Sequence, residues 1–183
     1  MPAPRGTADG AGDAGDGEYP FGRAEGSFFL AGGEALLAPD RPPARAPLLA
    51  YGANASPQRL AAKLPGVPVA ALAGELRGWS VVHSCHVSPY GAVPATLVEE
   101  PGDTARVHVL VVDPAGFEPL DATEPNYVRR RLEGLDLTVD RLGRIAVAEA
   151  YISRWGPLIL GGTPVPLGAL PQAELLARVR DGV

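Results

Sequence analysis

The sequence is poor in several residue types, and each scarcity excludes a class of protein. Cys85 is the only cysteine, so an intrachain disulfide framework and a cysteine-rich zinc module are both excluded. The longest apolar runs, such as FFLAGGEALLA and VHVLVV, are short or interrupted, and no charged segment followed by an apolar one lies near Met1. We therefore expect neither membrane insertion nor secretion, and a reducing cytoplasm fits best.

Positive charge is also scarce. The formal net charge is −5, and no arm rich in lysine or arginine is present, so the field of the protein repels phosphate backbones. Lys63 is the only lysine, and the bias toward Ala, Gly, Pro and Arg is typical of a GC-rich bacterial genome. We therefore expect no nucleic-acid partner.

Glycine and proline, in contrast, are abundant. The 23 Gly and 20 Pro predict many turns and favour strands over long helices, and 183 residues suffice for one domain with a core of its own. Residues 1–27 are predicted to be a disordered tail, since the first twenty contain almost no large apolar side chains. Residues 28–46 are predicted to be an extended lead-in, which adds a strand or wraps across the core, and residues 47–183 form the domain.

Alternating apolar residues predict five or more strands in this domain. LDLTVDRLGRIAVAEAY is expected to form a hairpin whose turn spans Arg141 to Arg144, with Gly143 at positive φ. Three helices are expected: one capped by Ser56 with Pro57 at its first position, one around Leu120 to Glu124 between two prolines, and one in PQAELLARVRDGV. The predicted fold class is α+β: a small mixed or antiparallel β-barrel with a few flanking helices.

The stretch LLAYGANASPQRL raises the question of why Gly52 and Asn54 follow a strand directly. Gly52 lets another group approach the backbone without a Cβ in the way, and the amides of this loop could face an anion or a carbonyl. On local grounds alone, a simple strand-to-helix connection explains the same residues.

A second stretch, GFEPLDATEPNYVRRRL, places Leu120 and Glu124 four residues apart, on one face of the expected helix. If Leu120 is buried, Glu124 points inward too, where desolvation and the helix C-terminus both disfavour the charged carboxylate. Such a group can act as a general base near neutral pH. The alternative is a Glu124 at the rim, hydrated or paired with Arg129 or Arg131.

Together, these two stretches resemble the γ-glutamylcyclotransferase superfamily, which includes the AIG2-like proteins. Its members carry a YGSN loop after the first strand and, later, an LDxxE segment followed by a Tyr that opens the next strand. Here YGAN at Tyr51 to Asn54 and LDATE at Leu120 to Glu124, then Tyr127, match in order and approximate separation. AEAYIS is similar to a later strand of the family, whose tyrosine, here Tyr151, borders the pocket. The resemblance covers about residues 47–160.

The resemblance implies a small barrel with a cavity between the loop and Glu124. It implies that Glu124 is the general base, and that a γ-glutamyl group is cyclised to 5-oxoproline with release of an amine or amino acid. Tyr51, Gly52, Ala53, Asn54, Tyr127 and Tyr151 are then substrate-binding residues, and neither a metal nor another cofactor is needed.

The chain also departs from the family. Ala53 replaces the serine of the loop, Ala55 stands where many members have leucine, and only Pro125 and Asn126 separate Glu124 from Tyr127. Some members have no demonstrated activity, so a non-catalytic domain that binds a small metabolite or a partner is the alternative. The sequence specifies neither the γ-glutamyl substrate nor the oligomeric state.

Other residues are weaker candidates for a catalytic, metal-binding or substrate-binding role. In a strand, His83 and Cys85 share a face and His86 points the other way, so three metal ligands cannot converge locally, and a buried strand cysteine is favoured. His108 is expected to have a local partner. Arg129 would steer an anionic substrate if Tyr127 lines the pocket, but a solvated edge is the favoured interpretation.

Overall fold

The computed structural model describes residues 19–38 and 46–181. Its strands are β1 (Phe28–Leu30), β2 (Leu48–Ala50), β3 (Val69–His83), β4 (Ala95–Val112), β5 (Tyr127–Val139), β6 (Gly143–Ser153), β7 (Ile159–Leu160) and β8 (Thr163–Pro164). Its α-helices are α1 (Pro57–Lys63), α2 (Phe117–Ala122) and α3 (Gln172–Arg180). Short 3-10 helices are η1 (Gly33–Leu37), η2 (Ala53–Ala55) and η3 (Pro114–Gly116).

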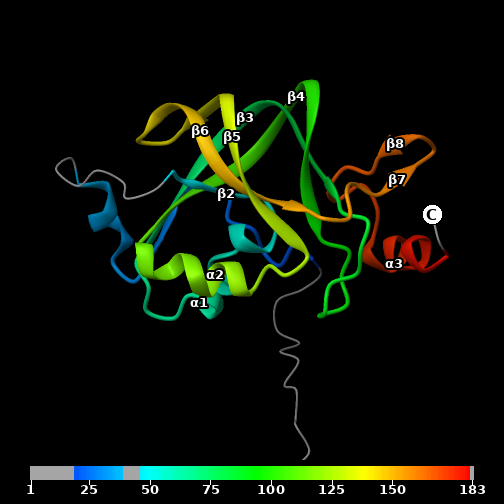
Figure 1. The fold of residues 1–183 in the computed structure, drawn as a ribbon, viewed down its shortest axis with the longest axis horizontal. Helices are drawn as coiled ribbons and strands as arrows, with labels where there is room; N and C mark the ends of the chain where they lie inside the picture. Colours follow the sequence, from blue (N-terminus) through cyan, green and yellow to red (C-terminus); the bar gives the residue numbers. More distant parts are fainter. Residues whose placement is uncertain (1–18, 39–45, 182–183) are drawn as a thin grey trace, which may run out of the picture.

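Five strands close into a barrel in the order β3-β4-β2-β6-β5, because β5 pairs back onto β3 through residues such as Leu76 and Leu137. β1 pairs with the first residues of β3, Val69 to Ala71, on the edge of β3 that faces away from β4 and that β5 also uses. The β2–β6 pair is parallel and the other pairs are antiparallel. The predicted α+β mixed barrel is therefore confirmed (Figure 1).

β3 and β4 are long strands that pair over most of their lengths. The register shifts between Arg77 and Trp79, which lets the pair bend as it crosses the barrel. β4 continues through Pro101 as one strand. The predicted hairpin turn is confirmed, with Arg141 at φ 63° and Gly143 at φ 71°.

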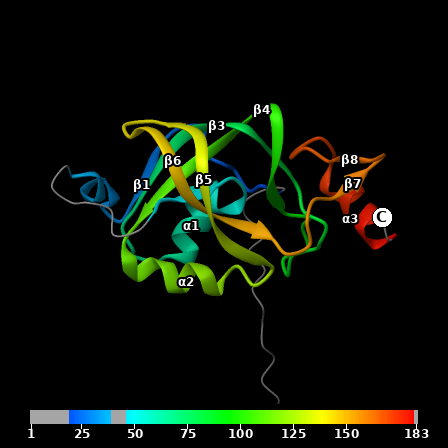
Figure 2. The ribbon, with the colours of Figure 1, turned by 45° about the horizontal axis from the view of Figure 1, so that its top comes forward.

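Apolar side chains form a core inside the barrel and a second cluster beneath it. The second cluster joins Leu48 of β2 to Leu60 and Leu64 at α1 and to Leu120 of α2, all at most 1% exposed. Burial of each such leucine contributes about 1.5–3 kcal/mol. Helices α1 and α2 therefore lie side by side under one end of the barrel, while α3 lies with the β7–β8 hairpin on another side (Figure 2).

The first helix follows the sequence signals closely. Ser56 is its N-cap and accepts a hydrogen bond from the Arg59 amide (3.4 Å), and Pro57 is at its first position, as predicted.

None of the helices in residues 19–38 and 46–181 is long and apolar enough to cross a membrane.

The structure differs from the prediction at the start of the chain. Residues 1–18 of the expected tail lie outside the described residues, but residues 19–27 pack on the barrel. Tyr19 and Phe21 are each 8% exposed and belong to the barrel core. Of the expected lead-in, residues 28–30 form β1, residues 33–37 form η1, and residues 39–45 lie outside the described residues.

Candidate functional site

The loop after β2 is shaped by contacts with distant parts of the chain. Tyr51 is 5% exposed, and its hydroxyl donates a hydrogen bond to the Tyr151 carbonyl. A Cβ on Gly52 would lie 2.4 Å from the Tyr19 hydroxyl oxygen. That hydroxyl in turn accepts a hydrogen bond from the Ala95 amide at 2.8 Å. Glycine is therefore needed at position 52 because Tyr19 closely approaches the backbone there.

Glu124 reaches the same place from α2, but not in the predicted way. The helix begins at Phe117 and ends at Ala122, so Pro119 lies in its first turn and Glu124 lies beyond its C-cap, Thr123. The predicted bounds, Leu120 to Glu124, were wrong, and the two residues do not share one helical face. Leu120 is nevertheless fully buried, and the Glu124 side chain is only 12% exposed.

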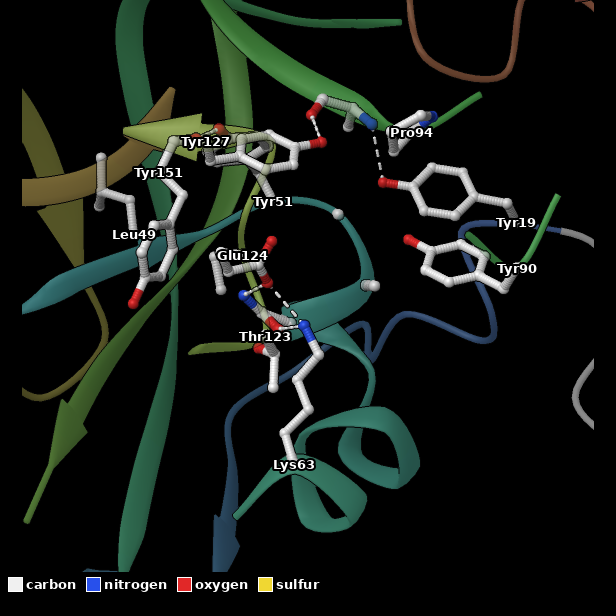
Figure 3. A pocket seen from close by; sticks show the side chains of 15 residues that line it. Tyr19, Leu49, Tyr51, Lys63, Tyr90, Pro94, Thr123, Glu124, Tyr127 and Tyr151 are labelled. Carbon is white, nitrogen blue, oxygen red and sulfur yellow. Dashed lines mark hydrogen bonds and ion pairs between the residues drawn. The ribbon is translucent and has the colours of Figure 1, made fainter. Parts of the chain in front are cut away.

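Glu124 is one corner of a triangle of polar side chains (Figure 3). The Lys63 ammonium donates to Glu124 Oε1 at 2.6 Å and to Asn54 Oδ1 at 2.8 Å. The side-chain nitrogen of Asn54, Nδ2, donates a hydrogen bond to the same Glu124 oxygen at 3.0 Å. The other oxygen, Oε2, receives no hydrogen bond from the described residues and is directed into a cavity.

This cavity has a volume of about 90 Å³ and is open to solvent. Its lining includes all seven residues that the sequence analysis singled out: Tyr51, Gly52, Ala53, Asn54, Glu124, Tyr127 and Tyr151. It also includes side chains that were not expected there, among them Tyr19, Lys63 and Tyr90. The structure thus brings the predicted residues together, while their roles in catalysis and binding stay predictions.

The sequence analysis did not identify Tyr19, Lys63 or Tyr90 as site residues, for reasons that differ among the three. Tyr19 fell within the predicted tail, and Tyr90 lies in a loop without a recognisable motif. One feature of the sequence could have drawn attention to Lys63, because it is the single lysine among 16 basic residues. The position of this lysine on α1 did not show that it would meet Glu124, which is distant in sequence.

The tyrosines around the cavity are neutral hydrogen-bonding groups. Burial raises the pKa of the Tyr19, Tyr51 and Tyr127 hydroxyls well above their usual range. Tyr127 donates to the Ala95 carbonyl at 2.9 Å, while Tyr19 accepts from the Ala95 amide. These two rings therefore fix both polar groups of Ala95 at the cavity wall.

Tyr151 lines the cavity with its ring, but its hydroxyl is engaged elsewhere. It donates to Asp121 Oδ1 at 2.6 Å. Burial raises the pKa of the Tyr151 hydroxyl, and the hydrogen bond to Asp121 raises it further. Arg129 joins the same group through ion pairs with Asp121 (3.1 Å) and Glu149 (2.7 Å). Arg129 therefore holds the end of α2 against β6, and the cation beside Glu124 is Lys63 rather than Arg129 or Arg131.

The histidines have local partners. His83 Nδ1 lies 3.1 Å from the Val93 carbonyl, His86 Nδ1 lies 2.8 Å from the Ser84 hydroxyl, and His108 Nε2 lies 3.0 Å from the Gly26 carbonyl. Desolvation lowers the pKa of all three. Cys85 is partly exposed, not buried as expected. No three His, Cys, Asp or Glu side chains of residues 19–38 and 46–181 are grouped so that they could hold a metal ion.

Comparison with known proteins gives structural likenesses only. No protein-family model matches the chain, and no curated protein matches it significantly. Solved structures do match. One of them is a γ-glutamyl cyclotransferase. It is 19% identical, with a TM-score of 0.49, over 59% of this chain and 66% of its own.

Two further matches have similar values. An uncharacterized protein from Homo sapiens is 19% identical with a TM-score of 0.49, over 59% of this chain and 66% of its own. A protein from Arabidopsis thaliana, whose structure was determined in solution, is 14% identical with a TM-score of 0.46, over 74% of this chain and 83% of its own. The chain thus covers slightly less than two thirds of the first two structures. Likenesses at this level establish neither an activity nor a substrate.

Proposed function

We propose that the protein is a γ-glutamylcyclotransferase-like enzyme, with Glu124 as its general base. The observation that carries the proposal is that only one of the two carboxylate oxygens of Glu124 accepts hydrogen bonds from the described residues. One oxygen is held by Lys63 and Asn54, while the other is open to a cavity bordered by the Tyr51–Asn54 loop. The order of the YGAN and LDATE motifs also supports it.

The reaction needs one base and a substrate held in a folded conformation. Glu124 Oε2 accepts a proton from the α-amine of a γ-glutamyl compound, and the amine nitrogen attacks the γ-carbonyl of the same molecule. The new C–N bond closes the five-membered ring, and the bond to the leaving amine then breaks as that nitrogen takes a proton back from Glu124. The products are 5-oxoproline and a free amine. Because nucleophile and carbonyl share one molecule, positioning alone removes much of the barrier.

The loop amides of Gly52, Ala53 and Asn54 are the proposed donors to the oxyanion that forms at the γ-carbonyl. Backbone amides serve this purpose well because they are fixed before the reaction begins. Ala53 lacks the hydroxyl of the family's serine but retains its N–H. Backbone donors are therefore sufficient for this role in the proposal.

The open side of the cavity determines where the leaving group of a substrate would lie. The cavity is open to solvent, and Tyr90, which lines it, is 55% exposed. We expect the γ-glutamyl group to enter past Tyr90, with the leaving amine projecting into solvent.

The test is production of 5-oxoproline from a panel of γ-glutamyl amino acids and γ-glutamyl amines. Glu124→Gln keeps the size and hydrogen-bonding capacity of the side chain but removes the base, so we expect its kcat to fall by about 10²–10⁴-fold. Glu118→Gln is the matched control, because Glu118 is an exposed carboxylate on α2 that does not line the cavity. Equal turnover by wild type and Glu124→Gln would refute the role of Glu124.

The alternative is a non-catalytic domain that binds a small metabolite in this cavity. The ion pair between Lys63 and Glu124 favours it, because a pair of opposite charges at a cavity can bind a charged ligand without any proton transfer. The two functions differ in outcome. A folded wild-type protein that forms no 5-oxoproline from any panel member, yet binds one of them, is the binding domain.

A further inference from the structure

Lys63 is an unusual residue in this chain. Fifteen of the 16 basic residues are arginine, and the one lysine has its ammonium in the candidate site. Lys63 is the last residue of α1, between the buried Leu60 and Leu64, and its side chain is 21% exposed. It reaches the cavity from the side of the helix, as Figure 3 shows.

The ammonium group of Lys63 has more N–H donors than acceptors among the described residues. An ammonium group carries three N–H donors. Two of them reach Asn54 Oδ1 and Glu124 Oε1, and no acceptor among the described residues takes the third. Glu124 likewise has one engaged oxygen and one that is open. A cation and an anion therefore lie side by side at the cavity, each with one free hydrogen-bonding position.

This arrangement matches the head group of an α-amino acid, whose ammonium and carboxylate are attached to the same carbon. We propose that Lys63 is a specificity-determining residue that binds the substrate's α-carboxylate, while the free oxygen of Glu124 binds the α-ammonium. This inference rests on the proposed function and names the residue through which the site would recognise the α-carboxylate of the γ-glutamyl group. Glu124 alone would accept any amine of suitable shape, and Lys63 adds the requirement for a carboxylate.

Charge balance supports this occupant. A zwitterion adds no net charge to a partly buried ion pair, so each new charge meets an opposite one. A ligand with an ammonium but no carboxylate would leave three charges, two positive and one negative, in the same small space. Asn54 strengthens the selection by holding the lysine in place through its side-chain oxygen.

A purely structural lysine makes a different prediction. If Lys63 only holds Asn54 and Glu124 in position, its loss weakens both ligands alike, and the preference for a carboxylate does not change. The distinguishing quantity is therefore the ratio of the two affinities, which a general loss of stability does not alter.

The experiment measures binding with ligands that cannot react. L-2-aminoheptanoate keeps the α-ammonium and α-carboxylate but has no γ-carbonyl, and its α-carboxamide lacks only the negative charge. Calorimetry with wild-type protein should show the carboxylate bound about tenfold or more tightly than the carboxamide. Lys63→Met keeps the apolar stem without the charge and should reduce that preference to about twofold or less, whereas Lys63→Arg should retain most of it.

Arg131→Met is the control, since Arg131 belongs to an exposed ion pair with Glu133 (2.8 Å) and does not line the cavity. It should keep the wild-type preference. Thermal unfolding of each variant shows whether it is folded.

The inference and the proposed function fail in different ways. If 5-oxoproline forms and Lys63→Met keeps the wild-type preference, the role of Lys63 is refuted and the enzyme stands. If the preference depends on Lys63 but no 5-oxoproline forms, the cavity binds amino acids without cyclising them. If neither ligand binds to the folded wild-type protein, the inference is refuted as well.

Discussion

Gly52→Ala tests whether the segment before β1 truly shapes the candidate site. The added Cβ would lie 2.4 Å from the Tyr19 hydroxyl oxygen and 3.3 Å from the Ala95 Cβ. Real Cβ contacts are almost never as short as the first of these distances. The Tyr19 hydroxyl must therefore move, and its hydrogen bond with the Ala95 amide must lengthen or break.

The expected magnitude follows from these contacts. Overpacking of this kind costs about 1–3 kcal/mol, including about 1 kcal/mol for the hydrogen bond. Tyr19→Phe removes the hydroxyl, and the next atom of that ring, Cζ, lies at 3.6 Å, an ordinary contact distance. Alanine at position 52 should therefore cost less when residue 19 is phenylalanine. We expect the double variant to be more stable than the sum of the single effects by about 1 kcal/mol or more.

The assay is urea unfolding of the wild type, both single variants and the double variant, with free energies from linear extrapolation. Gly26→Ala is the control, since a Cβ there would meet no atom within 4 Å. We expect its effect to be within about 0.5 kcal/mol. Additive effects of Gly52→Ala and Tyr19→Phe, within about 0.5 kcal/mol, would refute the proposed contact.

Two further predictions concern the core beneath the barrel and the buried His108 of β4. Leu120→Ala should lower the free energy of unfolding by about 2–5 kcal/mol, because Leu120 is fully buried between α2 and the barrel; a loss below about 1 kcal/mol in urea unfolding would contradict this packing. His108 has a lowered pKa in the folded protein, so the unfolded chain takes up protons more readily, and stability is lost as pH falls below about 6.5. His108→Gln keeps a donor for Gly26 and should flatten the dependence of the unfolding free energy on pH between about 7 and 5.5; an unchanged slope would show that His108 does not cause it.

Local patterns predicted the elements of this fold well. Ser56 and Pro57 start α1, and Gly143 takes positive φ in the β5–β6 turn, because caps and turns depend on residues adjacent in sequence. The positive φ of Arg141 was not predicted. The parallel pairing of β2 with β6 was not predicted. It joins segments that are far apart in the chain, and alternation of side chains does not determine a strand's partner.

The candidate site was predictable to the extent that motifs carried it. The YGAN and LDATE stretches do line one cavity, but the helical argument for Glu124 was wrong, since α2 ends before it. Tyr19 was assigned to a tail because the residues before it are small and polar. Tyr19 and Phe21 pack in the barrel core, and hydrogen bonds such as that from the Ala24 amide to the Ala55 carbonyl also hold this segment on the barrel.

The connectivity of the cavity also has a consequence for folding. Glu124 meets Asn54 and Lys63 across separations of 70 and 61 residues, and the Tyr51 hydroxyl meets the Tyr151 carbonyl across 100. Contacts so distant in sequence form late, after the loops between them have closed. A chain with only its hairpins formed has no cavity, so ligand binding during refolding would report the final closure of the barrel rather than the appearance of its strands.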